Sequence, residues 1–226
     1  YNLSLNKVNH LALIMDGNQR WASINKKNKL EGYLAGLNNL KLIIDKCIEK
    51  KIKNLTVYAF SSENNNRASS KIIYNLIRNK HKDFLKELLK KNIININIIG
   101  EKKNISKDIL NIFKSLIKRK NPTINLNIVF NYGSLDEMVY IVNNFIKNKN
   151  KKINKNSVRS SMYLGNIPDP DILIRTGGYQ RLSNFILLNL SYTELFFTNT
   201  LWPDFSHNEL ESILLKFSKV NRNYGL

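Results

Sequence analysis

The sequence is short of cysteine and has no long apolar run, and both shortages narrow what the chain can be. Cys47 is the single cysteine among 226 residues, so no disulfide can form within the chain, which fits a reducing compartment. It stands in an apolar helical pattern, where a small core residue is the expected role. No apolar run approaches the roughly 18 residues that a membrane-spanning helix requires.

The first nine residues lack the apolar core region of a signal peptide. The sequence leaves open whether a targeting segment has been removed before residue 1. A chain rich in asparagine and lysine is compatible with a plastid-targeted precursor. The compartment is therefore undetermined at this stage. A soluble or peripheral-membrane protein inside the cell is the expectation.

Acidic residues are also scarce, since 17 Asp and Glu stand against 36 Lys and Arg and give a net charge of +19. The chain shows no zinc-ligand spacing and no KH-type or RRM-type motif, and its lysines are spread along the whole length. A background of lysine and 36 asparagines also arises from codon bias. The charge alone therefore does not indicate nucleic-acid binding, although a basic surface is expected to attract anions such as diphosphates and acidic membranes.

Short apolar runs alternate with longer amphipathic segments along the chain, without an internal repeat or a long linker. This alternation predicts an α/β fold, in which a roughly six-stranded, mostly parallel sheet is flanked by helices in one domain over residues 1–226. The predicted strands are residues 11–15, 55–60, 94–99, 124–130, 171–174 and 198–201. The predicted helices are residues 33–50, 71–91, 106–120, 135–147, 158–163, 185–196 and 208–220.

Three polar segments each follow a predicted strand: residues 16–20, 61–64 and 175–183. Ligands of open parallel sheets bind beyond the carboxyl ends of the strands, so we expect these segments to meet in space. Together they supply a carboxylate, glycines that permit close backbone approach, and at least three arginines. Such a set suits a diphosphate and its Mg²⁺.

The same segments resemble a known family. Residues 10–22, HLALIMDGNQRWA, closely resemble the first motif of the cis-prenyltransferases, the undecaprenyl diphosphate synthase family. Residues 58–64, YAFSSEN, are similar to the middle motif, and the last motifs are resembled by DILIRTGG, RLSNF, ELFF and LWPDF between residues 171 and 205. Like that family, the chain lacks the DDxxD motif of trans-prenyl synthases.

The resemblance implies a function, partners and an assembly. Isopentenyl diphosphate would be condensed onto an allylic diphosphate, usually farnesyl diphosphate, with new double bonds in the cis configuration. The resemblance also implies a homodimer and an apolar tunnel that holds the growing chain. Product length and the residues that face the tunnel stay open at this stage.

The first motif implies the allylic site. Asp16 by itself reads as a turn aspartate, but the resemblance implies that it holds Mg²⁺, which would neutralise the leaving diphosphate. Gly17, Asn18 and Arg20 are expected to hold that diphosphate, with help from backbone N–H groups at a helix N-terminus. The rest of the expected substrate-binding set on this side comprises Gln19, Trp21, Lys29 and Tyr33, and packing is the favoured role of Trp21.

The last motifs imply the isopentenyl-diphosphate site. Arg175, Arg181 and Ser183 resemble its clamp, and arginines that flank a Gly-Gly pair favour bidentate phosphate recognition. Arg67 resembles another basic position of the same pocket. Ser61 and Asn64 are similar to residues that orient isopentenyl diphosphate and help to remove its proton. Neither is a strong base, so we interpret them as part of a hydrogen-bond network in which diphosphate or water accepts the proton.

Glu194 stands in an otherwise apolar stretch, where an unpaired carboxylate would be costly. A second metal ligand and a salt bridge at the dimer interface are equally compatible with that position.

Several residues depart from the family pattern, mainly around the allylic site. Gln19 replaces a small or basic residue, Lys29 stands where arginine is frequent, and Tyr33 stands where histidine is frequent. Lysine keeps the charge but loses the guanidinium fork, and tyrosine keeps at most one hydrogen-bond donor. Further departures are Asn65, Tyr179, Gln180 and Asn223, the last where many members carry an Arg-x-Gly that reaches the partner's site. We expect these changes to shift allylic affinity or substrate choice without abolishing turnover.

A catalytic chain has two alternatives. A family member that only supports a catalytic partner would tend to lose the metal aspartate and the first clamp, whereas both are present here. The second alternative, a nucleic-acid-binding protein, is supported only by the positive net charge.

Overall fold

The computed structural model describes residues 6–64, 68–90, 93–116, 118–148 and 152–222. Its centre is a six-stranded sheet in the order β3-β4-β2-β1-β5-β6, and every pair of neighbouring strands is parallel. The strands are β1 (His10–Ile14), β2 (Asn54–Ser61), β3 (Ile94–Ile99), β4 (Ile124–Tyr132), β5 (Ile172–Arg175) and β6 (Glu194–Phe197). The predicted α/β class is confirmed.

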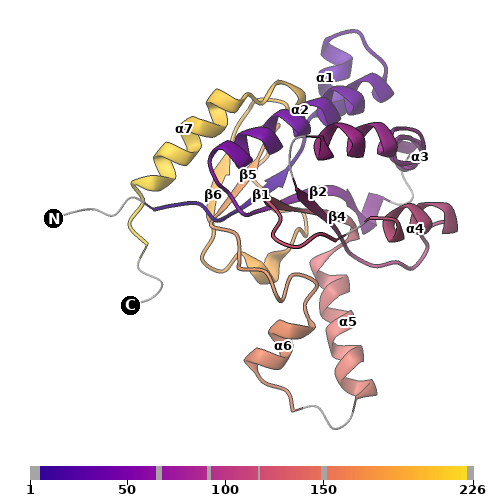
Figure 1. Cartoon of the computed structure of the whole chain (residues 1–226), viewed down its shortest axis with the longest axis vertical. Helices are drawn as coiled ribbons and strands as arrows, with labels where there is room; N and C mark the ends of the chain where they lie inside the picture. The colour runs from indigo at the N-terminus through magenta and orange to yellow at the C-terminus, as the bar shows by residue number, and fades with distance from the viewer. Residues whose placement is uncertain (1–5, 65–67, 91–92, 117, 149–151, 223–226) are drawn as a thin grey trace.

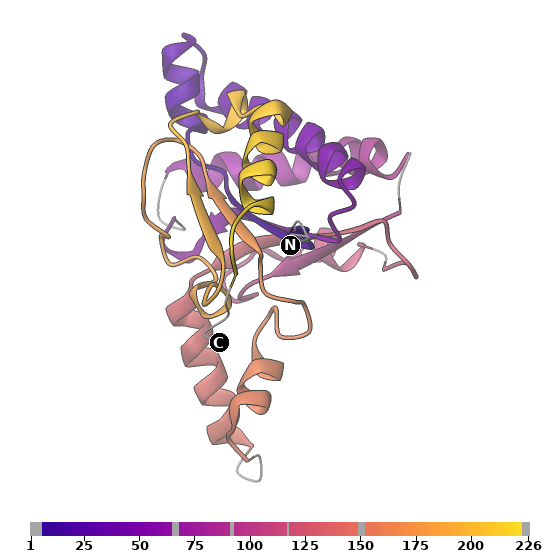
Figure 2. The same cartoon turned by 90° about the vertical axis from the view of Figure 1, so that its left-hand side faces the viewer.

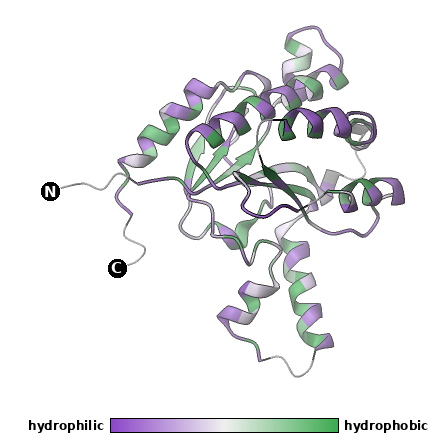
Figure 3. Ribbon diagram, viewed as in Figure 1, coloured by the Kyte–Doolittle hydropathy of each residue, from purple (hydrophilic) through white to green (hydrophobic). Residues whose placement is uncertain are grey.

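One face of the sheet is covered by helices, whereas side chains from the segment of residues 163–190 pack on the other (Figures 1 and 2). The helices of the described residues are α1 (Asn18–Ile24), α2 (Lys29–Glu49), α3 (Ala68–Leu89), α4 (Lys107–Lys114), α5 (Ser134–Lys147), α6 (Lys155–Ser161) and α7 (His207–Ser218). Buried side chains of α2, α3 and α7 pack with those of the strands in the largest core cluster. The helices are banded in both colours of the hydropathy scale, as amphipathic helices should be (Figure 3).

Helices α5 and α6 extend away from the sheet on the side opposite to α2, α3 and α7 (Figures 1 and 2). Ile141 and Phe145 of α5 pack there against Met162 and Val158 in a small cluster of their own. Within the described residues, no helix has the length and apolarity that a bilayer crossing demands.

The chain between β5 and α7 differs from the prediction. A helix over residues 185–196 and a strand over residues 198–201 were predicted, and both were wrong. The segment instead forms a short 3₁₀ turn at Leu187–Asn189 followed by β6. Ser183, Asn184 and Ile186 adopt positive φ angles, which a helix does not tolerate, and β6 gains backbone pairing with β5.

Smaller differences have local causes. The helix predicted over residues 106–120 ends at Lys114, where the Ser115 hydroxyl donates to the Ile112 carbonyl at 2.7 Å. Helix α2 starts four residues before the prediction because Asn28 and Glu31 form a capping box. Helix α1 was not predicted as an element, although a helix N-terminus was expected after Gly17. Strand β3 lies at one edge of the sheet.

Candidate active site

The carboxyl ends of the central strands bring the three polar segments together, as predicted. Ile14 of β1 lies between Tyr58 of β2 and Arg175 of β5 in the strand register. Asp16 follows two residues after Ile14, and Ser61 is the last residue of β2. Asp16, Ser61 and Arg175 all line one cavity of about 720 Å³.

The Asp16 carboxylate is shared by two arginines. Its Oδ1 accepts a hydrogen bond from Arg20 Nη2 at 3.2 Å, and its Oδ2 accepts one from Arg175 Nη2 at 2.9 Å. The Asp16 side chain is 29% exposed, whereas that of Arg175 is 4% exposed. One negative group is therefore held between two cations at the cavity, and solvent reaches the carboxylate.

Arg175 connects this carboxylate to the predicted isopentenyl-diphosphate clamp. Its Nη1 donates to Ser183 Oγ at 2.7 Å and to the Arg181 carbonyl. Its Nε is buried and has no hydrogen-bond partner among the described residues, so one charged donor is not used by the protein there. Arg175, Arg181 and Ser183 thus lie together at the cavity, as the sequence predicted.

Two glycines allow the segments to approach so closely. Gly17 has a φ of 117°, and an added Cβ would lie 2.9 Å from a methyl carbon of Leu201. Gly177 has a φ of 84°, and an added Cβ would lie 3.0 Å from the Asp16 carbonyl oxygen. Arg20 Nη1 donates to the Gly177 carbonyl at 2.7 Å, which fastens α1 to the segment after β5.

The LWPDF motif, residues 201–205, forms hydrogen bonds that hold the backbone of residues 16–20 in place. Trp202 N–H donates to the Asp16 carbonyl at 3.0 Å, and the buried Trp202 indole donates to the Gly36 carbonyl at 2.8 Å. Asn39 of α2 donates to the Trp202 carbonyl at 2.7 Å. The sequence identified this motif by resemblance alone, and the structure shows that it fixes the backbone of Asp16.

The expected allylic residues only partly gather at the cavity. Asn18, Gln19 and Tyr33 line it, and Gln19 Nε2 donates to the Tyr33 hydroxyl at 3.0 Å. Trp21 and Lys29 are not among the lining residues. The Trp21 indole instead donates to Asp204 at 2.7 Å, which agrees with its favoured packing role.

On the opposite wall, Ser61 is buried and lines the cavity beside Glu63. Asn64 ends a 3₁₀ turn that begins at Ser62, but its side chain lies outside the described residues, as do Arg67, Asn65 and Asn223. Tyr58 is the first residue of the middle motif. Its hydroxyl donates to the Tyr132 carbonyl at 3.0 Å, and burial raises its pKa above the usual value, so it remains a neutral donor.

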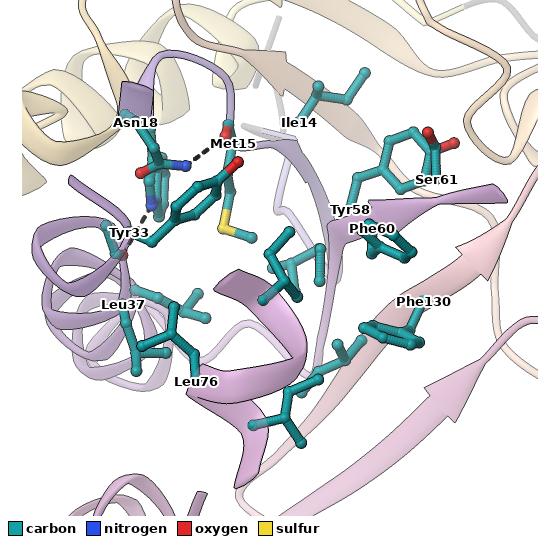
Figure 4. A pocket seen from close by; sticks show the side chains of 18 of the residues that line it. Ile14, Met15, Asn18, Tyr33, Leu37, Tyr58, Phe60, Ser61, Leu76 and Phe130 are labelled. Atoms are coloured by element: carbon teal, nitrogen blue, oxygen red, sulfur yellow. Dashed lines mark hydrogen bonds between the residues drawn. The ribbon is translucent and has the colours of Figure 1, made fainter. Parts of the chain in front are cut away.

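The interior of the cavity is apolar. Figure 4 shows side chains of Ile14, Met15, Leu37, Leu76 and Phe130 turned toward it. Further lining residues come from α2, α3, β3, α4, the turn after α4, and β4: Leu40, Ile73, Ile77, Phe84, Leu85, Ile96, Ile98, Ile112, Phe113, Leu116 and Ile128. The cavity therefore joins a cationic mouth to an apolar interior.

Glu194 lies apart from this cluster within the chain. It pairs with Ile172 at the start of β6, whereas Arg175 pairs with Phe197 at the end. Three residues along a strand correspond to about 10 Å. Within the chain, the structure does not bring Glu194 to Asp16, and Glu194 lies on the edge strand β6. Its role as a metal ligand and its role at a dimer interface both stay predictions.

Comparisons with known proteins agree with this geometry. A family model described as "Putative undecaprenyl diphosphate synthase" matches residues 14–225. An isoprenyl transferase of Aquifex pyrophilus is 37% identical, over 99% of this chain and 98% of its own length. A tritrans,polycis-undecaprenyl-diphosphate synthase of Thermococcus kodakarensis, described as specific for geranylgeranyl diphosphate, is 35% identical, over 96% of this chain and 86% of its own. The crystal structure of lavandulyl diphosphate synthase from Lavandula x intermedia with dimethylallyl diphosphate superposes with a TM-score of 0.86 at 26% identity, over the full length of both chains.

Proposed function

Because the chain belongs to the undecaprenyl diphosphate synthase family and is a prenyltransferase, we propose that it condenses isopentenyl diphosphate units onto an allylic diphosphate. Farnesyl diphosphate is the proposed primer, and a long-chain cis-polyprenyl diphosphate is the proposed product. Relatives are described with primers of other lengths, so several allylic primers should be compared.

The observation that supports this proposal is the pairing of a cationic mouth with an apolar interior in one cavity. A prenyl diphosphate has the matching polarity, with a charged head and a hydrocarbon tail. Guanidinium forks suit the head because each presents several N–H donors in one plane. The apolar wall suits the tail because burying it removes hydrocarbon surface from water.

The chain's own residues divide the work between the two diphosphates. Arg20, with Gly17 and Asn18, would bind the allylic head beside Asp16. Arg175, Arg181 and Ser183 would bind isopentenyl diphosphate. Holding both heads on one cluster would place their tails side by side for condensation. Ser61 would orient the isopentenyl group, and the proton would leave to diphosphate or water.

The donor set at Asp16 fits Mg²⁺ when a diphosphate is present. Among the described residues there is no group of three or more His, Cys, Asp and Glu side chains that would enclose a metal alone. Mg²⁺ commonly binds through one or two carboxylates together with substrate phosphates. The Asp16 oxygens retain lone pairs beyond those that Arg20 and Arg175 use. Held there, the ion would neutralise charge on the leaving diphosphate.

A homodimer is part of the proposal, and helix α5 supports it. Leu135, Met138, Val139, Val142 and Ile146 lie on one stripe of α5 and are 46–65% exposed. The adjoining side of α5, with Ile141 and Phe145, already packs on α6, so the apolar surface of the helix is wider than that packing uses. An exposed stripe of this size is typical of an interaction surface, and a second copy related by a two-fold axis would cover it.

The test is incubation of the purified chain with labelled isopentenyl diphosphate, Mg²⁺ and one of several allylic diphosphates, with the products sized. We expect a ladder of prenyl products that disappears with EDTA. Asp16→Ala should reduce kcat by roughly a hundredfold or more, as expected for loss of charge stabilisation at a leaving group.

Asp16→Asn is the matched control, because it keeps the shape and one acceptor but loses the charge. If the correctly folded chain made no product with any primer, the catalytic proposal would be wrong and a supporting subunit would take its place. If EDTA had no effect, Mg²⁺ would be removed from the proposal.

A further inference from the structure

Tyr179 places an aromatic ring among the three arginines of the mouth. It follows Gly177 and Gly178, whose φ angles of 84° and 82° turn the chain at this point. The ring centroid lies 4.0 Å from Cζ of Arg181, 4.8 Å from Cζ of Arg20 and 5.8 Å from Cζ of Arg175. The ring lines the cavity and is 42% exposed, so it forms part of the mouth itself.

The charges around the ring are unevenly compensated. Asp16 accepts hydrogen bonds from Arg20 and Arg175. In the part of the chain that the structure describes, the Arg181 guanidinium packs over the Tyr179 ring and forms no ion pair with a carboxylate. An aromatic face carries partial negative charge and attracts a cation above it, so the ring holds Arg181 beside two like charges.

The contact with the ring does not compete with phosphate binding. A guanidinium can pack its flat face on an aromatic ring while its N–H groups point outward in the plane. An anion in the mouth would therefore meet Arg181 with its donors free and its plane already oriented. Less side-chain entropy would then be lost on binding.

We propose that Tyr179 is a positioning residue, whose ring holds Arg181 in the orientation that binds the diphosphate of isopentenyl diphosphate. The inference rests on the proposed function of the Arg175–Arg181–Ser183 clamp. Tyr179 is also one of the departures from the family pattern.

The experiment compares Tyr179→Leu and Tyr179→Phe with the unmodified chain, using calorimetric titration of inorganic pyrophosphate and of isopentenyl diphosphate. Leucine removes the ring's charge distribution and keeps apolar bulk. We expect the leucine variant to bind both ligands about 3- to 30-fold more weakly, which corresponds to the loss of one to several cation–π contacts. The KM for isopentenyl diphosphate should rise by a similar factor, with a smaller change in kcat. Phenylalanine should restore most of the lost affinity.

Tyr192→Leu is the matched control, since Tyr192 is exposed and precedes Glu194 at the opposite end of β6. Equal thermal midpoints would show that the fold is intact. Unchanged affinity in Tyr179→Leu would overturn the inference, as would an equal loss in Tyr179→Phe, which would assign the effect to the hydroxyl. Tight binding of pyrophosphate without binding of isopentenyl diphosphate would instead refute the proposed function, while a Tyr179→Leu loss for pyrophosphate would still support the ring's role.

Discussion

At the scale of residues, the mouth depends on groups that cannot be exchanged for others of the same charge. Arg175 contacts Asp16, Ser183 and the Arg181 backbone at once, which requires a planar fork with several donors. A lysine there would keep the charge but could not hold all three contacts. Gly17 is similarly fixed, because a side chain would meet Leu201 and the backbone has a left-handed φ.

Gln19 and Tyr33 lead to a prediction about the allylic side. Both depart from the family pattern, and the structure shows that they bond to each other at 3.0 Å. We expect Gln19→Ala and Tyr33→Phe each to raise the KM for the allylic diphosphate about 2- to 5-fold. The double variant should be little worse than either single one, because one hydrogen bond is lost in all three.

Steady-state kinetics with farnesyl and geranylgeranyl diphosphates would measure these effects. Effects that multiply in the double variant would show that the two residues act independently. Tyr33→His, alone and together with Lys29→Arg, tests whether the departures set substrate choice. Lys29→Arg alone should matter less, because Lys29 does not line the cavity. An unchanged allylic KM in the combined variant would argue against that role.

At the scale of elements, the loop from Ser183 to Ile186 and the helix α5 are joined. Ser134 N–H, at the start of α5, donates to the Asn184 carbonyl at 2.9 Å, and Leu187 N–H donates to Ser134 Oγ at 2.6 Å. These hydrogen bonds from the start of α5 stabilise the left-handed backbone at Ser183 and Asn184, and so keep Ser183 at the clamp. A change at the outer face of α5 can therefore reach the site through this joint.

The exposed stripe of α5 leads to a prediction about dimer formation. Val142→Glu places a charge at the centre of the proposed interface, where an unpaired carboxylate would lose its hydration. We expect the variant to be monomeric at concentrations where the unmodified chain is dimeric, by light scattering after size-exclusion chromatography. Lys147→Glu, at the end of the same helix, is the control for a changed charge on α5. A dimer that survives in Val142→Glu would place the interface elsewhere.

At the scale of the whole molecule, a polar chain crosses four strands of the sheet. His10 Nδ1 donates to the Pro168 carbonyl, and because a carbonyl only accepts, Nε2 must accept from the Thr56 hydroxyl at 2.7 Å. Asn127 donates to Thr56 Oγ1 at 3.1 Å, and Asn97 donates to Asn127 at 2.9 Å. Protonation would turn Nε2 into a donor to Thr56 Oγ1, so it would reverse this hydrogen bond and leave a buried charge between the strands.

This arrangement predicts a pH-dependent stability. Burial lowers the pKa of His10 below its ordinary value of 6.5. The unfolded chain therefore binds a proton near pH 6.5 while the folded chain does not, so stability is full above that pH and falls as the pH falls. The contribution is at most about 1.4 kcal/mol per pH unit. Urea unfolding at pH 7.5, 6 and 5, at one protein concentration, would measure it.

His10→Asn is the comparison, because it keeps a donor and an acceptor but does not titrate. It should be less stable than the unmodified chain at pH 7.5, and the difference should shrink as the pH falls. Parallel pH curves would show that His10 does not carry the effect.

Contact of the basic surface with acidic membranes stays a prediction from the net charge of +19.

The sequence by itself determined the fold class and most of the mouth, because both rest on local signals. Apolar runs of strand length that alternate with amphipathic helices imply a parallel sheet, and the sheet rule then places Asp16, Ser61 and Arg175 together. The family and the prenyltransferase activity followed from the motifs.

Tertiary structure alone decided the rest. Residues 185–196 have helical spacing but form a turn and a strand, because pairing with β5 and left-handed backbone at Asn184 and Ile186 override local preference. Glu194 was separated from Asp16 by strand register, which no local pattern reports. The contact of Tyr179 with three arginines and the bond between Gln19 and Tyr33 likewise join segments whose mutual orientation is fixed only when the sheet and its helices pack.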